Sequence, residues 1–393
     1  MNVYKIEHVR PRRICVFLAT RGNYAKMHSV MISINNNPNL ELQIVIGGSL
    51  VLDEYEQHVE LIKNNGFFIN DSIHYILKGD TPESIASSSG FCTAFIAQAY
   101  NRLNPDISFI IADRFESLAA AQAALCLNIH IAHLEGGEIS GSIDERIRHA
   151  ITKLSHIHLV CNCEAKDRVI KLGENPENVF NVGNPSLDQL IHIDLNDTDS
   201  VYPYLKEHGK GTVPNLKKSF LVVSQHPVVT DVTNTQEHIH ATIEAIKVTG
   251  KQAIWVLPNI DAGSEIIRDK VNACINDNEN LPVCLIDGLP FSKYAVLLAN
   301  TACLVGNSSS GIREGAFLGV PVVNIGQRQC TRSRSDNVLD VINSSEAIAK
   351  GINYQIAHGP YPSSNIYGDG RSGIKISEIL ENPLPPLDKK ITY

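Results

Sequence analysis

Three acidic residues stand where the sequence could place them for proton transfer. Asp113 and Glu135 each follow an apolar segment with the composition of a buried β-strand, and Asp144 stands at the head of an expected helix. Carboxylates that share a closed site raise one another's pKa values, which suits proton removal and delivery near neutral pH. These residues therefore predict acid–base chemistry. The alternative for Asp144 is an ion pair with Arg148, four residues later on the same helix.

Cationic and glycine-rich segments predict a site for phosphate groups. Arg21 and Arg114 follow expected strands, and with Arg328 they would supply planar donors for phosphate oxygens. The segment 305–314, Val-Gly-Asn-Ser-Ser-Ser-Gly-Ile-Arg-Glu, has the pattern of a strand end, a tight turn and a helix start. Backbone N–H groups at a helix start, together with serine hydroxyls, bind anions. The alternative is an ordinary helix cap, a position that serine also favours.

The sequence does not predict a nicotinamide cofactor or a metal ion. Residues 368–373 match the dinucleotide pattern G-x-G-x-x-G, but no strand pattern precedes them and about twenty residues follow, too few for a βαβ unit. His156 and His158 straddle an expected helix-to-strand junction without a third ligand nearby, so we interpret them as structural. The nine cysteines include no Cys-x-x-Cys and are expected to be reduced.

Short apolar segments alternate with longer helical patterns, which predicts parallel sheets with crossover helices. The expected strands are 13–20, 41–47, 106–112, 128–134, 157–161, 179–183, 220–225, 252–258, 282–287, 302–306 and 320–325. The predicted fold class is α/β, with two Rossmann-like doubly wound domains that face a central cleft. Open folds of this kind bind ligands at the carboxyl ends of their strands.

The change from periodic to polar sequence predicts the domain boundaries. The expected parts are an N-terminal Rossmann-like domain 1–193, a polar linker 194–218, a C-terminal Rossmann-like domain 219–370, and a C-terminal helix and tail 371–393.

Charge and hydropathy exclude several partners. The net charge is −8 and no dense run of lysine and arginine occurs, which argues against a nucleic acid or an anionic membrane as partner. No apolar stretch reaches the roughly 18 residues of a membrane span. The first residues lack the apolar core of a secretory signal, so a cytoplasmic location is expected.

Five motifs occur in order and together resemble a known family. They are 113–115 (Asp-Arg-Phe), the long segment 133–158 beginning His-Leu-Glu-Gly-Gly-Glu, 225–231 (Gln-His-Pro-Val-Val-Thr-Asp), 258–264 (Pro-Asn-Ile-Asp-Ala-Gly-Ser) and 306–314. In this order they resemble the hydrolysing UDP-N-acetylglucosamine 2-epimerases, the enzymes of bacterial sialic acid synthesis and the epimerase half of the animal bifunctional epimerase/kinase. The resemblance runs from about Arg13 to Gly370.

The resemblance implies a fold, a reaction and an assembly. The fold is that of the glycosyltransferase B type, with the UDP-binding site in the C-terminal domain. The reaction converts UDP-N-acetylglucosamine and water to N-acetylmannosamine and UDP, through anti elimination to 2-acetamidoglucal and addition of water. Such enzymes catalyse the first step of sialic acid synthesis, form homodimers or homotetramers, and use neither a metal nor a cofactor.

The resemblance also implies a role for each site residue. The expected catalytic residues are Asp113, Glu135, Asp144 and His226. The expected ligands of the nucleotide phosphates are Arg21, Arg114, Ser308, Ser309 and Arg328, of which Arg328 could instead contact the edge of the uridine. Glu314 would bind the ribose hydroxyls, and the backbone at Leu289 would contact the uracil. His226 and Asn259 would line the cleft beside the sugar diphosphate. Which carboxylate removes the C2 proton and which returns it stays open.

Three alternatives remain. A sister enzyme that acts on UDP-2,4-diacetamido-2,4,6-trideoxyglucose in legionaminic acid synthesis would share every motif. A glycosyltransferase of the same fold, or a sensor of nucleotide sugars without catalysis, would not need the three carboxylates.

Overall fold

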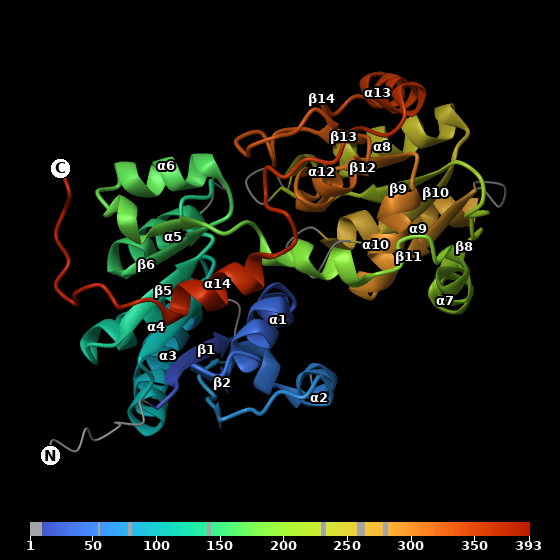
Figure 1. Ribbon diagram of the computed structural model, residues 1–393. Helices are drawn as coiled ribbons and strands as arrows, with labels where there is room; N and C mark the ends of the chain where they lie inside the picture. The colour runs from blue at the N-terminus through green and yellow to red at the C-terminus, as the bar shows by residue number, and fades with distance from the viewer. Residues whose placement is uncertain are drawn as a thin grey trace, which may run out of the picture. The chain divides into compact units, whose positions relative to one another are not determined.

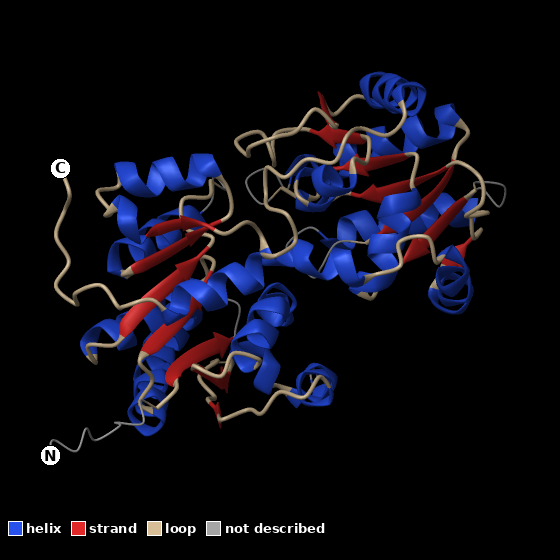
Figure 2. Ribbon diagram, in the orientation of Figure 1, coloured by secondary structure: helices blue, strands red, loops and turns tan. Residues whose placement is uncertain are grey.

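The computed structural model describes residues 10–53, 56–77, 81–139, 143–228, 233–257, 264–277 and 282–393. The chain divides into two compact units: unit 1 comprises residues 1–188 and 368–393, and unit 2 comprises residues 189–367. In each unit a sheet is covered by helices on both faces (Figure 1, Figure 2). No helix in the described ranges is long and apolar enough to cross a membrane.

Unit 1 is built on a parallel sheet whose described strands run in the order β3-β2-β1-β4-β5-β6-β7. The strands are β1 (Arg12–Leu18), β2 (Leu40–Ile46), β3 (Asp71–Ser72), β4 (Ile107–Ile111), β5 (His130–Leu134), β6 (Ile157–Val160) and β7 (Val179–Asn181). The helices are α1 (Arg21–Asn35), α2 (Glu56–Asn64), α3 (Pro82–Leu103), α4 (Phe115–Cys126), α5 (Ile143–Leu154), α6 (Cys163–Lys171) and α14 (Ser372–Glu381), with short 3₁₀ helices η1 (Gly48–Val51) and η3 (Pro176–Asn178).

The strands of unit 1 are apolar on both sides because both faces of the sheet are covered. Successive residues of a strand point to opposite faces. In β1, Ile14 and Val16 join the core beneath α1 and α14, whereas Cys15 and Phe17 join the core beneath α3 and α4. The alternation of strands with crossover helices therefore gives unit 1 three layers, in which the sheet lies between two layers of helices.

Unit 2 repeats this architecture with the described strand order β14-β13-β12-β9-β10-β11-β8, in which β8 alone is antiparallel to its neighbour. The strands are β8 (Lys210–Gly211), β9 (Phe220–Ser224), β10 (Gln252–Val256), β11 (Val283–Ile286), β12 (Cys303–Gly306), β13 (Val322–Ile325) and β14 (Val338–Val341). The helices are α7 (Val201–His208), α8 (Thr235–Thr249), α9 (Ser264–Asp277), α10 (Phe291–Asn300), α11 (Ser309–Ile312), α12 (Glu314–Leu318), α13 (Ser345–His358) and the 3₁₀ helix η5 (Thr198–Ser200). The 3₁₀ helix η4 (Pro185–His192) spans the boundary between the units.

The strand order fixes where each unit can bind a ligand. In unit 1 the chain leaves β1 toward β2 on one side and leaves β4 toward β5 on the other. In unit 2 the same divergence occurs between β9 and β12. At such a switch point the loops after two neighbouring strands diverge, and the crevice between them is the ligand site of open α/β sheets.

The units divide at points other than the expected linker. Residues 194–218 hold η5, α7 and β8, and β8 pairs with β11, so this polar segment belongs to unit 2. Val201 and Leu205 of α7 are fully buried in the core of unit 2. Residues 371–393, expected as a separate helix and tail, belong to unit 1, where Ile376 and Leu380 of α14 join the same core as the buried residues of α1. The reason is that short apolar segments within polar sequence are buried by contacts with residues far away in the chain, and the local sequence pattern does not show such contacts.

Candidate active site

Polar residues of unit 1 follow β1 and β4, the two strands of its switch point. Arg21 begins α1 just after β1, and Asp113 and Arg114 follow β4. Thr20 caps α1 by accepting a hydrogen bond from the backbone N–H of Asn23 at 3.2 Å. The Asn23 Oδ1 atom accepts from the backbone N–H of Thr20 at 3.1 Å. This reciprocal cap fixes the turn that carries Arg21.

Two residues at the predicted acids, one of them an acid itself, have strained backbones. Ala112, which immediately precedes Asp113, has φ of 60°, and Glu135 itself has φ of 68°. Non-glycine residues rarely adopt this left-handed conformation, and such strain is typically held in place at functional sites. Hydrogen bonds to neighbouring strands keep both residues there, from Ala112 N–H to Leu134 and from Glu135 N–H to Leu159.

Arg148 of α5 binds Asp113 directly. Its Nη2 atom donates to the Asp113 carboxylate, and its Nη1 atom donates to the Glu138 carbonyl at 2.6 Å. Arg148 is 3% exposed and the Asp113 side chain is 21% exposed, so the ion pair is partly buried. The sequence offered Asp144 as the partner of Arg148, but the tertiary structure brings Arg148 to Asp113, on a different strand end.

Arg114 and Asp144 share the same part of unit 1. The buried Glu116 carboxylate accepts two hydrogen bonds from the Arg114 guanidinium, at 3.1 and 3.2 Å. Burial lowers the pKa of Arg114, but the charges of Glu116 and, more weakly, Asp144 outweigh burial and raise it. The guanidinium therefore stays charged, with one edge fixed by Glu116.

Lys26 is a site residue that the sequence did not single out. It lies on α1, and its Nζ atom is 2.6 Å from Glu135 Oε2. The Glu135 side chain is 6% exposed, so Lys26 supplies the charge that an interior carboxylate requires. A sequence signal existed, because the Thr20 cap sets the helical phase and places Lys26 in the second turn of α1.

We expect Lys26→Met to lower kcat/KM roughly tenfold, which corresponds to about 1.4 kcal/mol of transition-state stabilisation. The reason is that the interior Glu135 carboxylate loses its cation. Steady-state kinetics with the UDP-sugar proposed below will measure the effect. Lys63→Met, which removes an exposed ion pair with Glu60, is the matched control and should leave the kinetics unchanged. Equal kinetics in both variants would contradict the role of Lys26.

Unit 2 has its polar centre at the switch point between β9 and β12. Asn307, 3% exposed, follows β12 and holds the loop after β9 in place. Its Oδ1 atom accepts from the His226 backbone N–H at 2.7 Å, and its Nδ2 atom donates to the His226 carbonyl at 2.9 Å. Asn307 lies within the glycine- and serine-rich motif but was not predicted as a site residue. Its position directly after the strand at a switch point is the signal that could have identified it.

His226 and Arg328 lie at this same centre. Arg328 Nη1 donates to the Asn307 carbonyl at 3.0 Å, and Gln329 Nε2 donates to the same oxygen at 3.0 Å. Burial, with a smaller contribution from the Arg328 charge, lowers the pKa of His226 to about 4. His226 is therefore neutral near pH 7 and can offer one N–H group to a ligand.

The serine-rich turn folds as a helix start, in two short pieces. Ser308 caps α11, Ser309 is its first residue, and Glu314 begins α12. The Ser308 and Ser310 hydroxyls are 2.9 Å apart, and Ser310 also binds the Tyr294 hydroxyl at 2.6 Å. The predicted strand–turn–helix is thus confirmed, and the helix is interrupted at Arg313.

Leu289 and Asn259 are the remaining predicted residues in the sequence of unit 2. Leu289 follows β11 and packs against the same apolar core as Tyr294. Asn259 lies outside the described residues. A pocket of about 240 Å³ opens beside His226 at the carboxyl ends of β9, β12 and β13.

His156 and His158, which the sequence analysis interprets as structural, bind protein atoms. His158 Nε2 is 3.0 Å from Glu174, and His156 Nδ1 accepts from the Ile131 backbone N–H at 3.1 Å. In the part of the chain that the structure describes, no group of three or more His, Cys, Asp or Glu residues is arranged to hold a metal ion.

Buried histidines make the stability depend on pH. Burial lowers the pKa values of His133 and His156 to about 4, and His158 shifts in the same direction. The unfolded chain, in which histidine titrates near 6.5, therefore binds more protons between these values, so stability is lost as the pH falls through this window. His133 alone accounts for about 3 kcal/mol across the window.

We expect the free energy of unfolding, measured with urea, to fall between about pH 6.5 and 5, above the range where carboxylates take up protons. His133→Gln removes one titrating group and should make this slope shallower by about one proton. A free energy of unfolding that is constant in this range would contradict the prediction.

Comparison with known proteins points to one family. The family model described as UDP-N-acetylglucosamine 2-epimerase matches residues 32–381. The chain is 34% identical over 370 residues to the UDP-N,N'-diacetylbacillosamine 2-epimerase (hydrolyzing) of Legionella pneumophila, covering 94% of this chain and 96% of that protein. It is 28% identical over 375 residues to the UDP-N-acetylglucosamine 2-epimerase of Neisseria meningitidis serogroup B, covering 95% and 96%.

A solved structure shares the fold. The crystal structure of a UDP-GlcNAc 2-epimerase from Neisseria meningitidis bound to UDP-GlcNAc matches with a TM-score of 0.78 at 16% identity, over 94% of this chain and 100% of that one. The two Rossmann-like domains of the glycosyltransferase B type, expected from the sequence, are thereby confirmed. From the family match over most of its length and the identity to these relatives, the chain belongs to the UDP-N-acetylglucosamine 2-epimerase family.

Proposed function

We propose that the chain is a hydrolysing 2-epimerase of a UDP-2-acetamido sugar. The observation that carries the proposal is the grouping of carboxylates with cations in unit 1. Asp113 is bound by Arg148, and Glu135 is bound by Lys26. Asp144 lies close enough to Arg114 for its charge to raise the pKa of Arg114. Each of the three carboxylates thus has a cation beside it in unit 1, and carboxylates grouped in this way can remove and return protons in turn.

The reaction needs acid–base groups on both faces of the sugar. A carboxylate removes the C2 proton while the C1–O bond to UDP breaks, and a C1=C2 double bond forms in a 2-acetamidoglucal. Water then adds its oxygen to C1, and a proton is delivered to C2 from the opposite face. Asp113, Glu135 and Asp144 are the groups that we assign to these proton transfers.

The leaving UDP needs donors that stabilise the charge on its diphosphate. We assign this role to Arg21 and Arg114 of unit 1 and to the Ser308–Ser309 turn, neutral His226 and Arg328 of unit 2. Glu314 and the backbone at Leu289 would bind the ribose and the uracil.

Between the two substrates that the sequence leaves open, we propose UDP-N,N'-diacetylbacillosamine, which is UDP-2,4-diacetamido-2,4,6-trideoxyglucose. The higher identity to the Legionella enzyme of that name, 34% against 28% for the Neisseria UDP-N-acetylglucosamine 2-epimerase, supports this choice. UDP-N-acetylglucosamine, with N-acetylmannosamine as product, is the second candidate, supported by the near full-length match to the Neisseria enzyme.

Proton NMR of turnover in heavy water tests both levels of the proposal. Each UDP-sugar is supplied separately, and we expect UDP and a free 2-epimer with deuterium at C2 to form together. A larger kcat/KM for the diacetamido sugar supports the first substrate, and a larger value for UDP-N-acetylglucosamine would replace it with the second. Transfer of the sugar to an acceptor without deuterium at C2 would identify a glycosyltransferase. Binding without turnover of either sugar would identify a sensor.

A further inference from the structure

Helix α5 makes polar as well as apolar contacts on its buried face. Of its described side chains, Arg148, Ile151 and Thr152 are buried, and two of these three are polar. Arg148 binds Asp113, and Thr152 Oγ1 is 3.2 Å from His133 Nδ1. Ile147, Ile151 and Leu154 of α5 pack in the core shared with α3 and α4, and the polar contacts fix the helix in addition to this apolar packing. Because α5 also carries Asp144, its position matters for the proposed acid–base groups.

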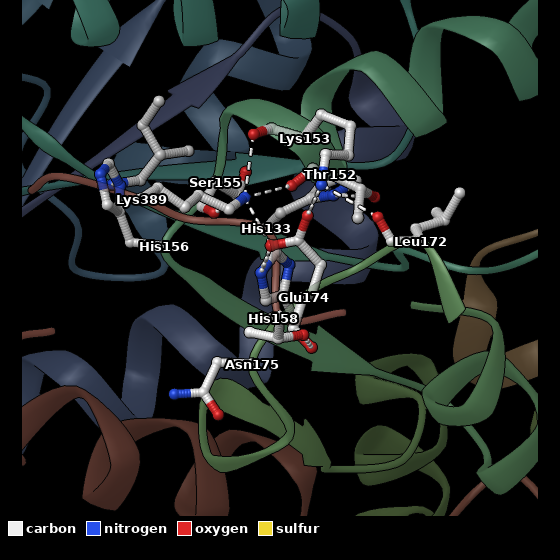
Figure 3. A network of polar contacts seen from close by, with 12 residues as sticks. His133, Thr152, Lys153, Ser155, His156, His158, Leu172, Glu174, Asn175 and Lys389 are labelled. Atoms are coloured by element: carbon white, nitrogen blue, oxygen red, sulfur yellow. Dashed lines mark hydrogen bonds and ion pairs between the residues drawn. The ribbon is translucent and has the colours of Figure 1, made fainter. Parts of the chain in front are cut away.

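The carboxyl end of α5 is capped by a lysine from the far end of the chain. Lys389 Nζ lies 3.2 Å from the Thr152 carbonyl, 2.9 Å from the Lys153 carbonyl and 2.5 Å from the Ser155 carbonyl (Figure 3). The last carbonyls of a helix have no partner within the helix, and a cation there also interacts favourably with the helix dipole. One ammonium group therefore satisfies the terminal turn of α5.

A buried carboxylate fixes this ammonium group. Glu174 is 1% exposed, and its oxygens lie 2.5 Å from Lys389 Nζ, 2.6 Å from Lys153 Nζ and 3.0 Å from His158 Nε2 (Figure 3). Burial raises the pKa of Glu174, but the hydrogen bonds from His158 and the two lysines outweigh burial and lower it to about 2. Glu174 therefore stays charged and binds Lys389 throughout the physiological range.

The segment around Lys389 is bound at the amino ends of β5 and β6 and at the residue Gly173, after α6. The Pro385 carbonyl is 2.8 Å from His130 Nε2, and the Leu387 carbonyl is 3.2 Å from His156 Nε2. Thr392 N–H donates to the Gly173 carbonyl at 3.3 Å. His130 begins β5 and His156 precedes β6, so these contacts lie at the edge of the sheet opposite Asp113 and Glu135.

We propose that Lys389 is a positioning residue for the acid–base site. Lys389 caps α5 and binds Glu174 at the edge of the sheet opposite Asp113 and Glu135. In this way it fixes the position of α5, the helix that carries Asp144 and also carries Arg148, the partner of Asp113. This inference rests on the proposed function for its catalytic readout. The C-terminal segment contacts none of the three carboxylates in any described interaction. The proposal nevertheless gives this segment a role in setting the geometry of the carboxylates.

Substitutions at two adjacent lysines test the inference. Lys389→Met removes the ammonium group and keeps the aliphatic stem, Lys389→Arg restores a cation, and Lys390→Met is the matched control at an exposed neighbour. Well below the melting temperature, we expect Lys389→Met to lower kcat about tenfold with KM within about twofold, because misplacement of catalytic groups slows the chemical step more than it weakens binding. Lys389→Arg should recover most of the activity, and Lys390→Met should match the wild type.

Hydrogen exchange of α5 gives a readout that does not depend on turnover. In Lys389→Met the amides of α5 should exchange faster than in the wild type, while those of α3 should not change. Wild-type kcat in Lys389→Met, or unchanged exchange of α5, would overturn the inference, as would a lower melting temperature with unchanged kcat. If the wild type hydrolyses no UDP-sugar, the proposed function fails, and the exchange of α5 still decides whether Lys389 positions this helix.

Discussion

Replacing Asp113 with Asn is expected to lower kcat about a thousandfold, the typical range for loss of a general acid or base. The amide cannot exchange a proton near neutral pH, but its oxygen can still accept a hydrogen bond from Arg148, so α5 keeps its anchor. UDP should bind with unchanged affinity, because the groups that we assign to the nucleotide lie mainly in unit 2. Steady-state kinetics and calorimetric titration with UDP measure the two quantities separately.

The opposite end of the same strand provides a matched control. Asp106 immediately precedes β4 and forms an exposed ion pair with Arg10. Asp106→Asn makes the same chemical change and should leave kcat within about twofold of the wild type. If Asp113→Asn turns over as fast as Asp106→Asn, Asp113 is not one of the proton-transfer groups, and the assignment would have to move to Glu135 and Asp144.

Gly306→Ala is expected to destabilise unit 2 by about 3–5 kcal/mol and to abolish tight binding of UDP. Gly306 has φ of 138°, and a Cβ atom there would lie 2.1 Å from the Ser224 carbonyl oxygen. Ser224 is the last residue of β9, so the clash would push β12 away from β9. Asn307 follows β12 and binds the backbone of His226 after β9, so this contact would be disturbed as well. Because the one tryptophan of the chain, Trp255, is buried in β10, its fluorescence reports the unfolding of unit 2.

A second glycine of unit 2 separates the clash from backbone strain. Gly250 ends α8 with φ of 62°, and an added Cβ atom there meets nothing within 4 Å. Gly250→Ala should therefore destabilise unit 2 by only about 1 kcal/mol and leave the affinity for UDP unchanged. Similar losses in the two variants would show that the close approach of β12 to β9 does not determine the stability of this site.

The strands and the class of fold could be predicted because their signals are local. Buried segments such as 107–111 are apolar on both faces, which only a covered parallel sheet explains. All the expected strands are present, and the acids at their ends lie at the carboxyl edge of the sheet because the strands are parallel. The strands that were missed, β3, β8 and β14, are two to four residues long or lie at a sheet edge, where the apolar signal is weak.

By itself the sequence determined the sheets, the switch-point loops and the kinds of side chain placed there, since period and composition reflect burial within a few residues of the chain. Only the tertiary structure decided which charges pair. Arg148 binds Asp113 rather than Asp144 four residues away, Lys26 reaches Glu135 across 109 positions, and Lys389 caps a helix that ends more than two hundred residues earlier. The physical reason is that an ion pair depends on distance and desolvation between elements, and neither quantity is encoded in the spacing of residues along one helix or strand.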